Sequence, residues 1–247
     1  MQIKAIKTRL LKPPQDDLFE AMTASIKKIP ERSILSIASK VVSIHQGRSI
    51  PKDKVKDKDK LIIQEADKYI PRNKVPGGYA VLTLKNNILI PSAGIDESNS
   101  GEYYLLWPNN IKKTVREFWR FLRKKYKVKK IGVIITDSHT VPMRRGVMGI
   151  ALAYYGFRPL HDYRGTKDLF GREFKVSAAN IVDSLAVSSV LVMGEGTERT
   201  PLALITDIPF VQFITKPYKP KKKSDVLEIP WDEDLYGPLL KAVKWRQ

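Results

Sequence analysis

Apolar runs separated by polar turns predict a chain in which strands and helices alternate. The β-branched runs at 33–38, 131–136 and 202–206 have the length and composition of buried strands. From 111 to 126, apolar side chains recur at helical spacing for about four turns, so a long amphipathic helix is expected to begin after Asn110, a good N-cap. Strands and helices that alternate in this way predict an α/β, or mixed α+β, fold.

Weaker patterns give the remaining elements. Asp16 and Asp17 are expected to open a helix whose apolar stripe runs through residues 18–29 and which Pro30 ends. A hairpin is expected over residues 79–90, because the Asn residues at its turn tolerate positive φ. Other expected segments are a strand at 3–8, a loop at 51–59, a helix at 61–69, an apolar segment at 147–155 and a helix at 177–193. We expect one domain over 1–210, with 211–247 as its C-terminal extension.

Composition narrows the class of protein. The chain has 247 residues, 43% of them hydrophobic, and no apolar run approaches the roughly 20 residues of a membrane span. Its start lacks the apolar segment of a secretory signal, so a soluble cytoplasmic protein is expected. The absence of cysteine excludes disulfides, thiolate metal sites and a cysteine nucleophile.

The net charge of +18 indicates an anionic partner. Lysines gather at 52–60, where they alternate with Asp, at 124–130, at the end of the long helix, and at 219–223. The favoured interpretation is that these lysines simply belong to a solvated surface. The second is that they attract phosphate-bearing small molecules. Nucleic-acid binding is the least favoured, because no aromatic-interleaved RNA motif accompanies the lysines.

Two acidic turns follow apolar strands and are the main candidates for chemistry. Asp96 lies in the turn of the segment 88–99, and Asp137 ends the strand of the segment 131–139. Hard oxygen ligands at strand ends can hold Mg²⁺ or Mn²⁺, and Ser138 could add a hydroxyl. The alternative is that each Asp only forms an Asx-turn or caps a helix.

Three further groups are weaker candidates. Glu195 lies between two glycines, where the backbone could approach a phosphate or could simply cap a helix. Arg144 and Arg145 could clamp a carboxylate or phosphate, or could form an exposed basic turn. The polar segment 162–173, which includes Arg164, favours a substrate-binding loop over a plain turn.

Six motifs stand in one order along the chain. They are S-K-V-V-S at 39–43, A-G-I-D-E-S-N at 93–99, I-I-T-D-S at 134–138, R-R-G at 144–146, D-Y-R-G-x-x-D-x-x-G-R-E at 162–173 and M-G-E-G at 193–196. This set resembles the γ-glutamyl ligase family of the deazaflavin coenzyme F-420, over roughly residues 1–210. The spellings S-I-H-Q-G-R and I-I-T-D-S-H-T resemble more the branch of the family assigned to folate metabolism.

The resemblance implies a ligase that uses GTP, or alternatively ATP, to join L-glutamate to an acceptor through an acyl phosphate. It implies the γ-glutamyl ligase fold, with mixed and antiparallel sheets, an intertwined homodimer and two Mg²⁺ or Mn²⁺ sites. Carried over by position, the implied metal ligands are Asp96, Asp137, Ser138 and Glu195. The implied nucleotide-binding residues are Ser39, Lys40, Asn99, Met193, Gly194 and Gly196. The implied catalytic residues are Asp96, Asp137 and Arg144.

Departures from the family pattern leave two points open. Ile44 replaces a second nucleotide-contacting Lys, and the segment 9–12 lacks the usual glycine, so the nucleotide preference is open. Ser138 replaces a Thr and keeps the hydroxyl. A folate-type acceptor is favoured over the deazaflavin, with Arg144, Arg145 or Arg164 as a clamp for its carboxylate. The competing class is a non-catalytic, basic RNA-binding module on the same fold.

Overall fold

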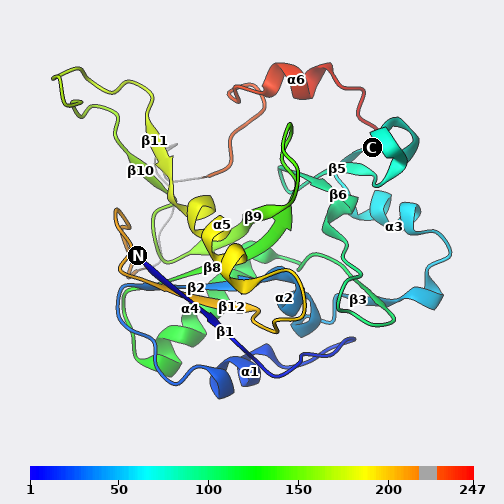
Figure 1. The fold of residues 1–247 in the computed structure, drawn as a ribbon, viewed down its shortest axis with the longest axis horizontal. Coiled ribbons are helices and arrows are strands. Elements are labelled where there is room, and N and C mark those ends of the chain that lie inside the picture. Colours follow the sequence, from blue (N-terminus) through cyan, green and yellow to red (C-terminus); the bar gives the residue numbers. More distant parts are fainter. Residues whose placement is uncertain (217–226) are drawn as a thin grey trace.

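A five-stranded mixed sheet forms the centre of the molecule (Figure 1). The computed structural model describes residues 1–216 and 227–247, so the lysine cluster at 219–223 lies outside the described residues. In spatial order the strands are β1 (Gln2–Ile6), β12 (Leu202–Thr206), β2 (Ser33–Ala38), β8 (Ile131–His139) and β9 (Met148–Tyr155). Only β2 and β8 pair in parallel within this sheet. Their carboxyl ends therefore meet at one edge of the sheet.

Helices cover both faces of the central sheet (Figure 1). One face packs against α1 (Leu18–Ser25), α2 (Ser39–His45) and α4 (Ile111–Tyr126), and the other packs against α5 (Ile181–Met193). Strand β2 and the first six residues of β8 are almost wholly buried. A strand covered on both faces needs a continuous apolar run, which explains why both segments are recognisable in the sequence.

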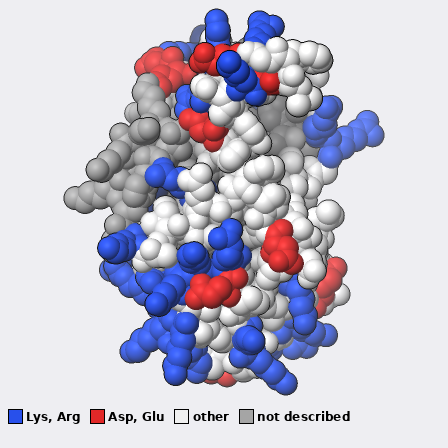
Figure 2. All heavy atoms as spheres, turned by 90° about the vertical axis from the view of Figure 1, so that its left-hand side faces the viewer, with Lys and Arg blue, Asp and Glu red and all other residues white. Residues whose placement is uncertain are grey.

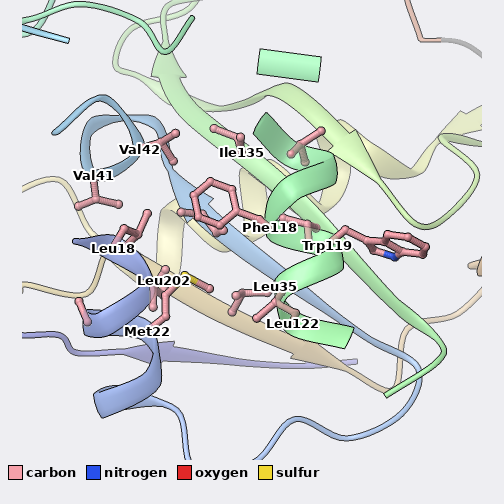
Figure 3. Packing of buried hydrophobic residues seen from close by; sticks show 14 of the residues in the cluster. Leu18, Met22, Leu35, Val41, Val42, Phe118, Trp119, Leu122, Ile135 and Leu202 are labelled. Atoms are coloured by element: carbon pink, nitrogen blue, oxygen red, sulfur yellow. The ribbon is translucent and has the colours of Figure 1, made fainter. Parts of the chain in front are cut away.

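The larger core lies between the sheet and the helices α1, α2 and α4 (Figure 3). Leu18 and Met22 of α1 meet Phe118 and Leu122 of α4 over Leu35 of β2, and each of these side chains is at most 1% exposed. Burying a side chain of this kind stabilises the fold by about 1.5–3 kcal/mol. This core fixes the strands whose ends carry the candidate site.

A lateral lobe packs beside the carboxyl edge of the sheet. It contains the antiparallel pair β3 (Ser49–Pro51) and β7 (Tyr103–Leu105), the sheet of β4 (Lys68–Ile70), β5 (Leu82–Lys85) and β6 (Ile88–Pro91), and the helix α3 (Lys58–Glu65). The lobe has a small apolar core of its own around Ile62 and Ile95. The turn between β5 and β6 has Asn86 and Asn87 at φ of 51° and 62°, as the sequence predicts.

Two further segments extend from the body (Figure 1). A hairpin is formed by β10 (Leu160–Asp162) and β11 (Ala178–Asn180), and the polar segment 162–173 belongs to its projecting part. The short helix α6 (Gly237–Ala242) precedes the C-terminus, where Arg246 bridges to Tyr69 of β4. No helix in the described part of the chain is long and apolar enough to cross a membrane.

Several element boundaries differ from the sequence expectations. Helix α1 ends at Ser25, because Ile26 is already extended, so the apolar stripe continues to Ile29 without helix. The helix expected at 177–193 begins only at Ile181, since residues 178–180 pair in the hairpin.

The expected loop at 51–59 and helix at 61–69 are both displaced. Residues 52–54 form a 3₁₀ turn, α3 begins at Lys58, and β4 takes Lys68 to Ile70. Asn110 does precede α4, but it is left-handed and its side chain makes no capping bond. Tertiary pairing overrides local propensity at these positions.

Candidate functional site

A cavity of about 370 Å³ lies at the carboxyl edge of β2 and β8. Its walls come from the start of α2, the end of β8, the loop between β6 and β7, the loop between α5 and β12, and the segment after β1. The parallel pairing of β2 with β8 sets Ala38 opposite Thr136, so the residues that follow each strand face the same space. Open α/β sheets commonly bind ligands at such an edge.

Asp137 reaches the cavity from the end of β8. The register of β8 against β9 shifts between Ile135 and Thr136, a bulge directly before this carboxylate. One carboxylate oxygen accepts a hydrogen bond from Trp107 Nε1 at 2.5 Å, and the other accepts from the backbone N–H of Ser138 at 2.9 Å. Burial raises the pKa of Asp137 to about 6, and these two donors only partly oppose the rise.

Asp96 reaches the cavity from the loop between β6 and β7. Its backbone exchanges two hydrogen bonds with Leu105, at 2.9 and 2.8 Å. Its carboxylate pairs with Lys40 Nζ at 2.7 Å and accepts from the N–H and hydroxyl of Ser98. Burial alone would raise the pKa of Asp96, but the charge and hydrogen bond of Lys40 outweigh burial and lower it.

The loop after α5 forms the third wall. Gly194 caps α5 with a φ of 78° and its N–H bonds to Val190 O. Across the cavity, Asn99 Nδ2 donates to Gly196 O at 3.0 Å, which joins this loop to the Asp96 loop. Glu198 accepts from the Gly196 N–H at 2.8 Å, while Glu195 is exposed. A glycine-rich backbone at this position can approach a ligand closely.

Ten of the eleven residues singled out as site residues line this one cavity. They are Ser39, Lys40, Asp96, Asn99, Asp137, Ser138, Met193, Gly194, Glu195 and Gly196.

The three candidate clamp arginines do not line the cavity. Arg144 and Arg145 are exposed on the turn between β8 and β9. Arg164 lies in the projecting part of the hairpin, where its guanidinium forms a bidentate pair with Asp162 at 2.8 and 2.7 Å.

The donors in the cavity fit a hard divalent cation in their chemistry, because carboxylate and hydroxyl oxygens are the ligands that Mg²⁺ and Mn²⁺ prefer. Within the described residues, no three His, Asp or Glu side chains converge into a ready metal-binding group. The ammonium of Lys40 pairs with the carboxylate of Asp96 and balances its negative charge. Mg²⁺ commonly takes one or two protein carboxylates and completes its shell with water and substrate phosphates, so the pair Asp96 and Asp137 would suffice.

Sequence reasoning missed two residues of the site. Trp107 supplies the donor to Asp137 and is 3% exposed. Glu198 lines the cavity and orders the glycine-rich loop. The T-E-R-T segment gave no motif for Glu198, and the only sign for Trp107 was a large aromatic residue after a short strand-forming run.

Comparison with known proteins identifies the family. Residues 5–207 match the F420-0:gamma-glutamyl ligase family. The chain belongs to this family. Its ligase class and its mixed α/β fold agree with what the motifs imply.

Several similar proteins carry the name "Coenzyme F420:L-glutamate ligase". The protein of that name from Methanopyrus kandleri is 33% identical over 208 residues, which covers 77% of this chain and 81% of the relative. That from Methanococcus maripaludis strain C6 is 32% identical over 81% of this chain and 88% of its own length. That from Methanocaldococcus jannaschii is 32% identical over 74% and 79%. The likeness therefore extends over most of each protein.

Proposed function

We propose that this ligase uses a nucleoside triphosphate to join L-glutamate to the carboxylate of a small acceptor through an amide bond. The observation that carries the proposal is the single cavity in which Lys40, Asp96, Asp137 and the glycine-rich loop 193–196 meet. Cationic, acidic and backbone groups in one cavity suit a phosphate chain and its counter-ions. The names of the relatives support glutamate as the amine substrate.

The chemistry needs no nucleophile from the protein. An acceptor carboxylate oxygen attacks the γ-phosphorus and the nucleoside diphosphate leaves, which gives an acyl phosphate. The glutamate amine then attacks the acyl carbon, inorganic phosphate leaves and the amine releases a proton. Catalysis on this route consists of positioning and of stabilising negative charge, and fixed polar groups in a partly buried cavity do both.

Individual side chains have separate tasks on this route. Lys40 and the N–H groups of the loop 193–196 bind the phosphates, and Asn99 holds that loop in place. Asp96, Asp137, Ser138 and Glu195 are the residues that would hold Mg²⁺ or Mn²⁺, which when bound neutralises phosphate charge. GTP is the expected nucleotide and ATP the alternative. We also expect a homodimer, as the family resemblance implies.

The acceptor has two candidates. The names of the relatives favour the deazaflavin coenzyme F420. A folate-type acceptor is the second candidate. It is supported by Ile44, which departs from the pattern of the deazaflavin ligases and lines the cavity with an apolar side chain that is 3% exposed. The experiment below includes both.

Purified protein is incubated with Mg²⁺ or Mn²⁺, GTP or ATP, L-glutamate, and either the deazaflavin or tetrahydrofolate monoglutamate. Mass spectrometry should show one glutamyl unit added to an acceptor, with matching release of nucleoside diphosphate. Omission of glutamate is the control, and no glutamyl product should then form. If nucleotide binds but no acceptor gains a glutamyl unit with either nucleotide, the proposed function is wrong.

RNA binding is a second candidate function because of one surface feature. Arg120, Arg123, Lys124, Lys127 and Lys129 line a shallow hollow at the end of α4. Figure 2 shows Lys and Arg side chains gathered over the lower part of one face of the molecule. Tight RNA binding at physiological salt would support this function, whereas binding that falls away with salt reflects charge alone.

A further inference from the structure

Trp107 lies between the lateral lobe and the central sheet. It follows β7 by two residues, and its indole N–H donates to Asp137 of β8. Trp107 is 3% exposed, so its indole has little access to solvent. A buried N–H paired with a carboxylate is a strong, charge-assisted contact.

The lobe makes room for the indole at one glycine. Gly94 has a φ of 70°, and a Cβ at this position would lie 2.0 Å from Trp107 Nε1. Its neighbours Ser92 and Ala93 also have positive φ, at 54° and 52°, although neither is glycine. Positive φ at such residues costs free energy and persists where surrounding structure enforces it. The turn that carries Asp96 is thus shaped around the Trp107 ring.

A partly buried ion cluster also contacts Trp107. Arg48 Nε donates to Trp107 O at 3.2 Å, and Lys85 Nζ lies 5.7 Å from the centre of the indole ring. Both cations pair with Glu65, Arg48 at 2.8 Å and Lys85 at 2.6 Å. The backbone and the ring of Trp107 are therefore fixed independently of Asp137.

Asp96 is tied to the same unit. Its two backbone hydrogen bonds with Leu105 connect it to the strand that leads into Trp107. Asp96 and Trp107 therefore belong to one hydrogen-bonded part of the lobe, whereas Asp137 belongs to the central sheet. The bond from Trp107 to Asp137 is a direct side-chain link between these two parts, and it lies beside the cavity.

We propose that Trp107 is a positioning residue that sets the distance and orientation between the carboxylates of Asp96 and Asp137. This inference rests on the proposed function only in that both carboxylates are expected to serve one bound cation. It assigns to Trp107 no contact with substrate. Its role is to hold Asp137 at one rotamer and the lobe at one separation from the sheet.

The test variant is Trp107→Phe, which keeps a large aromatic ring and removes the N–H. Trp119→Phe is the matched control, because Trp119 is also buried, at 4% exposed, and its Nε1 donates to Ile131 O at 2.9 Å, away from the cavity. Both variants lose a buried indole and one hydrogen bond. A purely structural role predicts the same outcome for both.

We expect Trp107→Phe to weaken Mn²⁺ binding to the nucleotide-free protein at least tenfold, measured by electron paramagnetic resonance, and Trp119→Phe to change it less than twofold. In the ligase assay, Trp107→Phe should lower kcat at least tenfold with the Michaelis constant for glutamate nearly unchanged. Equal Mn²⁺ affinity in the two variants, or no Mn²⁺ binding by the wild-type protein, would overturn the proposal.

A second measurement depends on neither metal nor activity. The chain has four tryptophans, and the Trp107 indole N–H signal in a ¹⁵N spectrum is assigned by its loss in Trp107→Phe. Asp137→Asn should shift this signal strongly and leave the Trp119 signal in place. An unmoved Trp107 signal contradicts the contact itself. If the signal moves and Mn²⁺ affinity falls while no acceptor is glutamylated, the proposed function fails and the positioning role stands.

Discussion

The loop that carries Asp96 and the strand end that carries Asp137 present carboxylates to the same cavity in opposite electrostatic settings. Asp96 is paired with the ammonium of Lys40, and this contact lowers its pKa. Asp137 has only neutral N–H donors, and burial raises its pKa to about 6. One carboxylate is therefore firmly ionised, and the other is poised near neutral pH.

This difference bears on the proposed cation site, because the protein has a net charge of +18. Lys40 pairs directly with Asp96, whose side chain is 38% exposed, whereas Asp137 has no charged hydrogen-bond partner among the described residues and burial is the largest influence on its pKa. An unpaired buried carboxylate is costly, and a bound cation would relieve that cost. Three experiments test this contrast between the two carboxylates.

The largest expected effect is on catalysis. Asp137→Asn should lower kcat more than 100-fold, about 3 kcal/mol of transition-state stabilisation, and Asp96→Asn should lower it at least tenfold. Both assays use saturating Mg²⁺. Glu97→Gln is the control, because Glu97 lies beside Asp96 but pairs with Lys58 and does not line the cavity. Retention of more than about a tenth of wild-type turnover by either Asp variant contradicts its assignment as a ligand.

The next effect is on stability as a function of pH. Because the folded-state pKa of Asp137 is raised to about 6, the folded protein keeps a proton that the unfolded chain loses from about pH 4 upward. Its contribution to stability is present below pH 4 and is lost as pH rises to 6. The free energy of unfolding of Asp137→Asn, relative to that of the wild type, should thus rise by on the order of 2–3 kcal/mol between pH 4 and pH 7. This rise is expected whatever the difference in stability between the two proteins at pH 4.

Denaturant unfolding of both proteins at pH 4, 5.5 and 7 measures this change. For Asp96→Asn we expect the stability relative to the wild type to change with pH in the opposite direction. The pKa of Asp96 is lowered, so its contribution is present above about pH 4 and is lost in acid. Solvent screening at a side chain that is 38% exposed should keep that effect within about 1 kcal/mol. Parallel pH curves for Asp137→Asn and the wild type would show that Asp137 is not poised as described.

The smallest effect concerns Lys40. Lys40→Ala removes the cation that pairs with Asp96 and leaves this carboxylate to repel phosphate, so the Michaelis constant for the nucleotide should rise about tenfold, or ~1.4 kcal/mol. Lys58→Ala breaks the pair with Glu97 on the same loop and should change that constant less than twofold. Steady-state kinetics with varied nucleotide measures both. Equal increases would mean that the loop as a whole, rather than Lys40, governs nucleotide binding.

The sequence predicted the parts of the fold and site that depend on local pattern. The strands β2, β8 and β12 were recognisable because buried strands need unbroken apolar runs. Asp137 was recognisable because it directly follows the apolar run of β8, although the strand itself continues to His139. The motif around Asp96 was also recognisable, although its local pattern alone allowed a simple Asx-turn.

Contacts between distant segments could not be predicted in this way. Trp107 and Asp137 are 30 residues apart in sequence, and their bond depends on how the lobe packs against the sheet. The bulge before Asp137 and the positive φ of Ala93 are likewise set by tertiary packing. Arg144 shows the converse, because its motif is distinct but the structure leaves it exposed on a turn outside the cavity.

The strand order has a consequence for synthesis of the chain. Among the described strands, β1 pairs only with β12, which inserts between β1 and β2, so β1 is synthesised about 200 residues before its partner. Until residue 202 emerges, β1 has no partner and one edge of β2 is open, which is a template for misassociation. Pairings of such long sequence separation form late and slowly. We therefore expect the nascent chain to depend on chaperones until β12 is made, and the cavity at the carboxyl edge of the sheet to be completed only then.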